Sequence, residues 1–181
     1  MKAIRTAIPE VLVIEPRVFG DDRGYLFESF NERAIRDLAG VSANFVQDNH
    51  SRSVRNTLRG LHYQIRQPQV KVLRVVIGEI LDVVVDIRRS SPTFGKWVSV
   101  RLSAENKRMI WIPAGFAHGF TVLSDVADCL YKVSDYWAPQ FERTILWNDP
   151  DLAIDWQLAG EPILAAKDKV GTRFADAEVF D

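Results

Sequence analysis

The sequence predicts an all-β protein, a sandwich or a barrel, built as one domain over residues 1–181. From Phe45 almost to Pro150, short stretches of strand-like composition follow one another, separated by Gly, Pro, Asn, Asp or Ser. There is no alternation of strands and helices, no GxGxxG sequence and no phosphate-binding P-loop, so a mononucleotide-binding fold is not expected. The chain of 181 residues suits one domain with a sizeable core.

The N-terminal segment is expected to contain strands and a tight turn. Met1–Ile14 has the composition of one or two strands interrupted at Pro9. Gly20–Gly24 has turn composition, and Tyr25–Phe30 alternates aromatic and polar residues as a strand does.

The clearest helix signal follows this segment. Asn31 is a suitable N-cap and Gly40 a suitable stop, with Ala34, Ile35 and Leu38 forming a short apolar stripe. The strands expected afterwards are Phe45–Asp48, Thr57–Tyr63, Lys71–Ile77, Ile80–Arg88, Trp97–Leu102, Met109–Ile112, Phe120–Leu123, Asp128–Val133 and Thr144–Trp147. After Pro150 the β pattern weakens, and the tail is expected to wrap around the domain.

Composition excludes several classes of partner. The net charge of −1 gives no global field toward nucleic acid or a membrane surface, so neither is an expected partner. The single cysteine, Cys129, allows no intrachain disulfide, which fits a reducing compartment, and its strand setting favours a packed thiol. No apolar run approaches the length of a membrane span and no signal peptide is recognisable, so a cytoplasmic location is expected.

The segment from Asn44 to Arg74 concentrates polar residues within a β pattern. It contains His50 and His62, two of the three histidines, together with Gln47, Asn49, Arg59 and Lys71. Strict alternation puts Leu58, Gly60, His62 and Gln64 on one strand face and Arg59, Leu61, Tyr63 and Ile65 on the other. For Arg59 and His62 to reach one ligand, the strand must twist or bulge near Gly60.

Three side chains in this pattern suit proton-transfer chemistry. His62 is the best-placed general base, because an unperturbed imidazole titrates near pH ~6.5. Lys71 begins an apolar strand and can stabilise an oxyanion or enolate, or it can extend to solvent. Tyr131 lies in mid-strand and suits a general acid or a core aromatic.

Other residues suit ligand binding. Arg23, Arg59 and Lys167 can bind phosphate, and surface ion pairs are the alternative. Gln47 and Asn49 share a strand face and can bind a sugar or a base. The turn aromatics can stack on a nucleobase or pack in the core; they are Phe19, Tyr136 and Trp137.

A metal site is an alternative hypothesis. Residues 113–118, ending at His118, have the PxGxxH form of a cupin metal motif, but the other cupin motif would need a second histidine where Gln64 stands. A metal-dependent cupin oxygenase or isomerase would therefore have to use His50, His62 and His118. A non-catalytic carbohydrate-binding jelly roll is a further alternative.

Six fragments in order are similar to one family: Phe45–Ser51, Leu58–Gln64, Asp86–Arg88, Ser91–Gly95, Ile112–Phe120 and Trp147–Pro150. Together they resemble the dTDP-4-dehydrorhamnose 3,5-epimerases, enzymes of dTDP-rhamnose biosynthesis, which supplies lipopolysaccharide O-antigen. The resemblance extends from Phe19 to Asp168. It implies a cupin-type double-stranded β-helix (jelly roll) with one or two short helices. It also implies no metal or other cofactor, a dTDP-sugar substrate, and a homodimer that exchanges N-terminal strands.

The resemblance also implies a role for each matching residue. His62 matches the base, Asp168 the carboxylate that orients it, Lys71 the cation that stabilises the enolate, and Tyr131 the acid on the opposite face. The positions matching substrate-binding residues are Phe19, Arg23, Glu28, Gln47, Asn49, Arg59, His118, Trp137, Glu142 and Lys167. Arg23 and Glu28 are expected from the partner chain, and Phe19 and Trp137 near thymine.

Two positions depart from the family pattern. Val70 stands where glycine is usual, and Trp137 stands where tyrosine is frequent. These departures leave open an enzyme that inverts only C3 or only C5, or one that uses another nucleotide.

Overall fold

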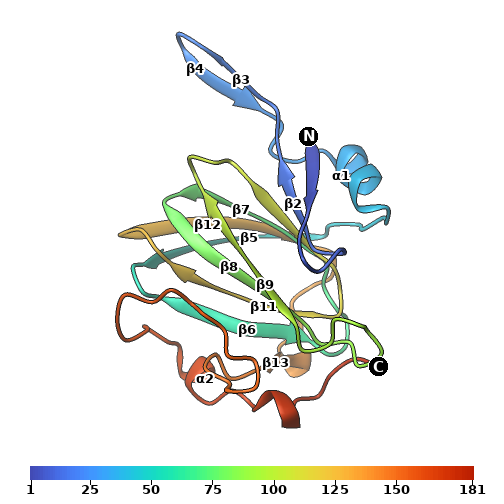
Figure 1. Ribbon diagram of the computed structural model, residues 1–181. Helices are drawn as coiled ribbons and strands as arrows, with labels where there is room; N and C mark the ends of the chain where they lie inside the picture. Colours follow the sequence, from blue (N-terminus) through green and yellow to red (C-terminus); the bar gives the residue numbers. More distant parts are fainter.

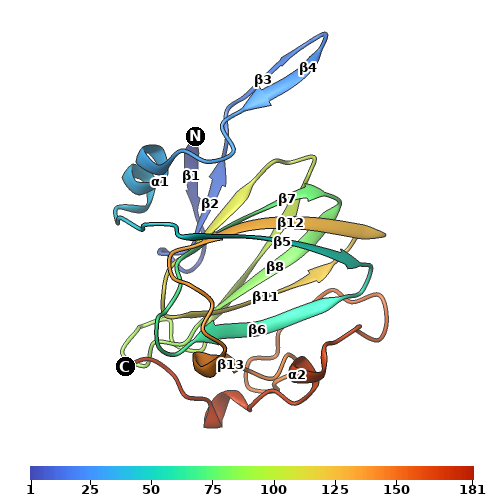
Figure 2. The same cartoon turned by 180° about the vertical axis from the view of Figure 1, so that it is seen from behind.

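The computed structural model describes residues 1–181, and its two antiparallel sheets pack face to face as a jelly roll (Figures 1 and 2). The six-stranded sheet has the order β1-β2-β10-β7-β12-β5, the five-stranded sheet the order β13-β6-β11-β8-β9, and β3 and β4 form a separate hairpin. The strands are β1 (Lys2–Arg5), β2 (Leu12–Glu15), β3 (Val18–Asp21), β4 (Gly24–Phe27), β5 (Gln47–Val54), β6 (Leu58–Gln64), β7 (Lys71–Ile77), β8 (Glu79–Asp86), β9 (Trp97–Ser103), β10 (Met109–Ile112), β11 (Phe116–Val122), β12 (Val126–Val133) and β13 (Glu142–Thr144). The helices are α1 (Glu32–Ala39) and α2 (Ala166–Lys169), with 3₁₀ turns at Pro139–Phe141 and Phe174–Asp176. The all-β jelly-roll prediction, with two short helices, is confirmed.

The capping residues predicted for the first helix are confirmed. The Asn31 side chain accepts a hydrogen bond from the Ala34 N–H at 3.0 Å. Gly40 adopts the left-handed conformation with φ 71°, and its N–H bonds to the Arg36 carbonyl. The sequence therefore defines both ends of α1.

Among the strands predicted from Phe45 onward, three have the largest boundary errors, and the others differ by at most two residues at each end. The strand predicted at Phe45–Asp48 is β5, which runs from Gln47 to Val54. The strand predicted at Phe120–Leu123 is β11, which begins at Phe116, directly after the turn at residues 113–115. The strand predicted at Thr144–Trp147 is β13, Glu142–Thr144. Apolar runs mark strands only where a face is apolar, and β5 carries polar residues on its inner face.

Three apolar clusters hold the layers together. One fills the space between the sheets and includes Leu73, Val84 and Phe120. A second lies on the outer face of the five-stranded sheet, where residues 145–180 cover it. The third lies on the outer face of β2, β10 and β7 against α1. The tail therefore wraps the domain, as expected, and it closes the outer side of β6 (Figures 1 and 2).

Strand β6 contains the irregularity expected near Gly60. Its pairing with β11 shifts between His118 and Phe120. Gly60 has φ +128°, and a Cβ at this position would lie 2.6 Å from the Cα of Gly119. Only glycine accepts both this backbone conformation and this close approach.

The bulge changes which side chains share a face. Arg59 and His62 both line the cavity between the sheets, whereas Leu58 and Leu61 both pack in the outer cluster under the tail. Strict alternation, which placed Leu58 with His62 and Arg59 on the opposite face, is therefore wrong across Gly60. The bulge itself is confirmed, and it brings an arginine and a histidine to one site.

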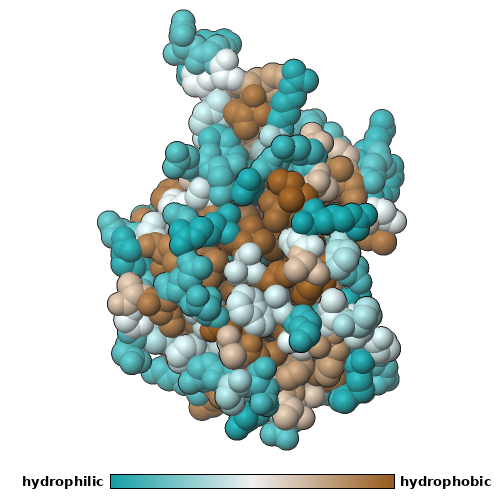
Figure 3. All heavy atoms as spheres, in the orientation of Figure 1, coloured by the Kyte–Doolittle hydropathy of each residue, from teal (hydrophilic) through white to brown (hydrophobic).

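The β3–β4 hairpin projects from the body, at the end of the molecule away from α2 (Figures 1 and 2). Its tip is hydrophilic (Figure 3), while Phe19, Tyr25 and Leu26 leave 53%, 63% and 74% of their surface exposed. An extended hairpin with three exposed large apolar side chains is a surface suited to contact with another protein chain. None of the helices has the length and apolar character required to span a lipid bilayer.

Candidate active site

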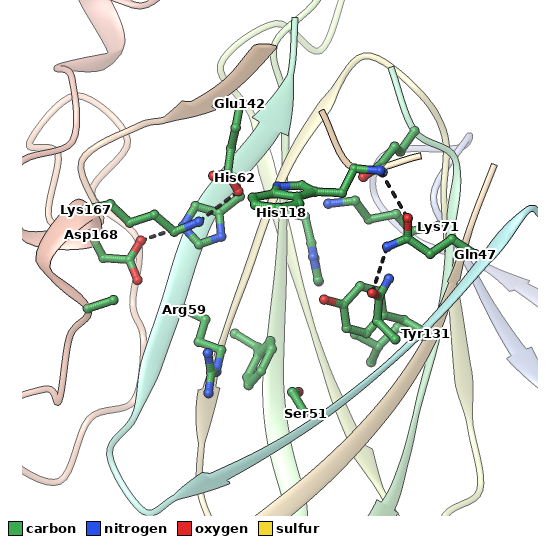
Figure 4. A pocket seen from close by; sticks show the side chains of 16 residues that line it. Gln47, Ser51, Arg59, His62, Lys71, His118, Tyr131, Glu142, Lys167 and Asp168 are labelled. Atoms are coloured by element: carbon green, nitrogen blue, oxygen red, sulfur yellow. Dashed lines mark hydrogen bonds and ion pairs between the residues drawn. The ribbon is translucent and has the colours of Figure 1, made fainter. Parts of the chain in front are cut away.

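A cavity of about 360 Å³ opens between the two sheets (Figure 4). One wall comes from β6, β11 and the tail around α2, and the other from β5, β7 and β12. All four residues predicted to carry chemistry line it, as do all but three of the positions that the resemblance assigns to substrate binding. Tyr136, which is also a candidate from the sequence for stacking on a base, does not line it. The predicted residues in the cavity are His62, Lys71, Tyr131, Asp168, Gln47, Asn49, Arg59, His118, Trp137, Glu142 and Lys167.

The three exceptions are Phe19, Arg23 and Glu28. The first two belong to the projecting hairpin, where they line a depression of their own. Arg23 is exposed and pairs with Asp21 at 2.6 Å, and Glu28 accepts a hydrogen bond from Asn31. Within one chain, the fold does not bring these residues to the cavity.

His62 forms a close pair with a carboxylate from the tail. Its Nε2 lies 2.5 Å from Asp168 Oδ1, and the Asp168 side chain is 1% exposed. Parallel bridges between Thr57 and Ile163 and between Ile145 and Thr172 hold the tail on either side of α2. The carboxylate can only accept, so a neutral His62 donates Nε2–H and keeps a lone pair on Nδ1.

Burial sets the charge of this imidazole. Desolvation lowers the pKa of His62, and the hydrogen bond and charge of Asp168 oppose that shift. At neutral pH the ring is therefore uncharged and able to take a proton. The buried Asp168 stabilises the imidazolium that would then form.

Tyr131 lies on the other wall. It is on β12 of the six-stranded sheet, whereas His62 is on β6 of the five-stranded sheet. Burial raises the pKa of the Tyr131 hydroxyl, which therefore stays protonated at neutral pH. That hydroxyl lines the cavity, so a proton donor and a proton acceptor face the same space from opposite sheets (Figure 4).

Lys71 brings a cation into this space. Burial lowers the pKa of its ammonium group to about 8, opposed first by the charge of Asp82 and then by that of Glu142. Lys71 stands at the start of β7 and lines the cavity. Val70, before it, packs beside the outer cluster under α1, and its N–H bonds to Ser134 Oγ at 2.8 Å.

Other polar side chains around the cavity are held in place by hydrogen bonds and an ion pair. Gln47 Nε2 donates to Asn49 Oδ1 at 2.9 Å, and the Trp137 N–H donates to Gln47 Oε1 at 3.1 Å. Trp137 is 59% exposed and lines the cavity, where its ring offers a stacking surface. Lys167 Nζ lies 2.8 Å from Glu142 Oε1.

Sequence reasoning missed several lining residues. They are Ser51, Gln69, Leu73, Phe120 and Ala165. Strand alternation was a usable signal for three of them, because Ser51 follows Asn49 by two residues, Leu73 follows Lys71, and Phe120 follows His118. Gln69 and Ala165 lie outside strands, so no periodicity marks them.

The three histidines do not converge. His62 and His118 line the cavity, but His50 lies on the outer face of the six-stranded sheet, 3.1 Å from Asp128. No group of three or more His, Cys, Asp or Glu side chains is arranged to hold a metal ion. The ligand set required by the metal-dependent alternative is therefore not assembled. Cys129 is packed in the inner cluster, and burial raises the pKa of its thiol to about 12.

A jelly roll whose cavity holds a buried histidine–aspartate pair, a tyrosine on the facing sheet and a lysine defines a cupin-type protein whose cavity is suited to two-sided acid–base chemistry. The model of the family described as dTDP-4-dehydrorhamnose 3,5-epimerase matches residues 5–176. The chain belongs to this family.

Individual relatives agree with this assignment. A dTDP-4-dehydrorhamnose 3,5-epimerase from Pseudomonas aeruginosa is 63% identical over 180 residues, which cover 99% of each chain. The crystal structure of a dTDP-6-deoxy-D-glucose-3,5-epimerase from Legionella pneumophila, in complex with dTDP-4-keto-L-rhamnose, superimposes with a TM-score of 0.95 at 50% identity, covering 98% of this chain and 94% of that one. A 3′-monoepimerase from Streptomyces bikiniensis, in complex with dTDP-quinovose, gives a TM-score of 0.89 at 36% identity, covering 97% and 88%.

Proposed function

We propose that this protein epimerises dTDP-4-dehydro-6-deoxy-D-glucose at C3 and C5, giving dTDP-4-dehydro-L-rhamnose. Its family membership and its 63% identity to the Pseudomonas aeruginosa enzyme support the reaction. The observation that carries the mechanism is the placement of His62 and Tyr131 on facing sheets of one cavity. We also place the enzyme in the cytoplasm, with a soluble sugar-nucleotide substrate.

The proposed chemistry uses the ketone of the substrate. The C4 carbonyl acidifies the protons on C3 and C5, and His62 removes one of them through Nδ1. The resulting enolate carries its charge on the C4 oxygen, where the ammonium group of Lys71 stabilises it. Tyr131 then donates a proton to the same carbon from the other face. Inversion follows because base and acid approach from opposite walls, and no cofactor is required.

The function is tested by NMR of the sugar after incubation in D₂O. Deuterium is expected at both C3 and C5 of dTDP-4-dehydro-6-deoxy-D-glucose, together with the L-rhamno product. Uptake at C3 alone would identify a monoepimerase, such as the Streptomyces bikiniensis relative. If deuterium appears at neither C3 nor C5, the proposal is contradicted.

We further propose that the active unit is a homodimer in which the β3–β4 hairpin of each chain completes the cavity of its partner. In one chain Arg23 is exposed, 90% by side-chain area, and belongs to a depression separate from the cavity. The hairpin is held in its projecting direction by its own chain: Lys107 lies 4.6 Å from the Tyr25 ring and Arg74 lies 5.9 Å from the Phe27 ring. A hairpin that is fixed in a direction away from the cavity of its own chain is suited to contact the cavity of a second copy.

Subunit mixing tests this arrangement. A His62→Ala chain has an intact hairpin, and a chain with Arg23→Ala and Glu28→Ala has an intact cavity wall. Each homodimer is expected to be nearly inactive. Random mixing is expected to restore about a quarter of wild-type activity, because about half of the dimers are mixed and one of their two sites is intact. If the activity of the mixture is only the sum of the two residual activities, the hairpin acts in its own chain or has no part in the reaction.

A further inference from the structure

A fully buried aspartate, Asp82, lies behind the cavity wall. It is on β8 and 0% exposed. One oxygen, Oδ2, lies 2.8 Å from His118 Nε2, and the other, Oδ1, has no hydrogen-bond partner although it is buried. Burying a carboxylate is costly unless both of its oxygens have partners. The hydrogen bond to the His118 imidazole provides a partner for only one of the two oxygens of Asp82. The negative charge therefore acts on other groups inside the barrel.

The first of these groups is His118 itself. Asp82 accepts, so the imidazole donates Nε2–H toward the interior of the barrel. This hydrogen bond fixes the tautomer and leaves Nδ1 as the second ring nitrogen available to a ligand. His118 lines the cavity and its side chain is only 9% exposed. Its orientation toward a ligand thus depends on Asp82.

The second group is the ammonium of Lys71. Burial is the largest effect on its pKa, and Asp82 is the largest of the charges that oppose this effect. Glu142 also opposes it, but that carboxylate is paired with Lys167 at 2.8 Å. The other titratable side chains that line the cavity are Arg59, His62, His118, Tyr131 and Asp168. Arg59 Nε donates to Ser53 Oγ at 3.0 Å, and Asp168 is already bonded to His62. Asp82 is the carboxylate with a fully buried oxygen that has no hydrogen-bond partner.

We propose that Asp82 is a positioning residue, which fixes the ring of His118 and supplies the negative charge that keeps Lys71 cationic. This inference rests on the proposed function, in which the lysine stabilises an enolate. Without the carboxylate, a buried amine would lose its proton near neutral pH and would no longer balance the oxyanion. Asp82 therefore acts on the reaction without touching the substrate.

Asp82→Asn tests this role, because asparagine keeps the size of the side chain and removes its charge. In the wild type, kcat is expected to fall as the pH rises through about 8, where Lys71 loses its proton. In the variant this alkaline limb is expected about one pH unit lower, which corresponds to a loss of about tenfold in kcat on the alkaline side. Toward pH 6.5 the kcat values of the wild type and the variant are expected to converge. The KM of the variant is expected to stay raised at every pH, because the ring of His118 is no longer fixed.

A second measurement needs no turnover. The side chain of Lys71 is titrated by NMR in protein labelled with ¹³C,¹⁵N-lysine, with Lys71→Arg used for assignment. Its midpoint is expected to fall by about one unit in Asp82→Asn. If that variant does not fold, Asp82→Ser provides the same comparison. This titration separates the two proposals, because it can succeed even where the wild type shows no epimerisation.

Asp86 provides the matched control on the same strand. It is also 0% exposed, but it bonds to Arg88, Ser91 and Thr93 away from the cavity. Asp86→Asn is expected to lower stability without moving the alkaline limb or the lysine midpoint. A uniform loss of kcat at every pH in Asp82→Asn, with an unchanged lysine midpoint, would overturn the inference, since it would show only a structural role.

Discussion

Replacing His62 with alanine is expected to abolish deuterium uptake at C3 and C5 and to reduce epimerisation by at least about 10²–10⁴-fold, the range of a general base. The loss should be at the upper end, because the same residue starts the reaction at both carbons. The cavity offers no substitute: Asp168 is held on α2, and the pKa of the Tyr131 hydroxyl is raised by burial. NMR in D₂O and a coupled assay of product measure the two losses.

His50 provides the control for this variant. It is also a strand histidine paired with a carboxylate, Asp128, but it faces away from the cavity. His50→Ala is expected to stay close to wild type in exchange and turnover. Exchange that persists in His62→Ala at the wild-type rate would show that another group is the base.

The inner faces of the strands were predictable because they follow a period of two residues. Gln47 and Asn49 share a face of β5, as predicted, and a hydrogen bond joins their side chains along the cavity wall. The bulge at Gly60 could be inferred only because a functional hypothesis required Arg59 and His62 to meet. Periodicity by itself assigned these two residues to opposite faces.

The partners of the site residues could not be predicted from local pattern. Asp168 is 106 positions from His62, and the tail that carries it has little strand signal. Asp82 stands in the apolar strand β8 and is not among the residues that line the cavity. Its contact with His118 depends on how two distant strands pair. Such contacts follow from tertiary packing, so only the resemblance indicated Asp168, and nothing in the sequence indicated Asp82.

Replacing Tyr131 with phenylalanine is expected to separate exchange from inversion. His62 remains, so it can still remove a proton, exchange it with D₂O and return deuterium to the same face. In the wild type the Tyr131 hydroxyl on β12 donates the proton to the opposite face of the sugar. The variant lacks this hydroxyl, so that face has no proton donor. Deuterium uptake should therefore continue while formation of the L-rhamno product falls by about 10²–10⁴-fold. NMR resolves both quantities in one sample, from the lost C–H signals and from the couplings of the ring protons.

Tyr136→Phe is the matched control, since Tyr136 is 62% exposed and does not line the cavity. It is expected to invert and exchange at the wild-type rate. If Tyr131→Phe instead loses exchange and inversion in parallel, then the hydroxyl is needed before the enolate forms and the two-wall mechanism is wrong. If it keeps both, the returning proton comes from another group. Only a selective loss of inversion assigns the base and the acid to different sheets, because the facing sheets define the two faces of the sugar.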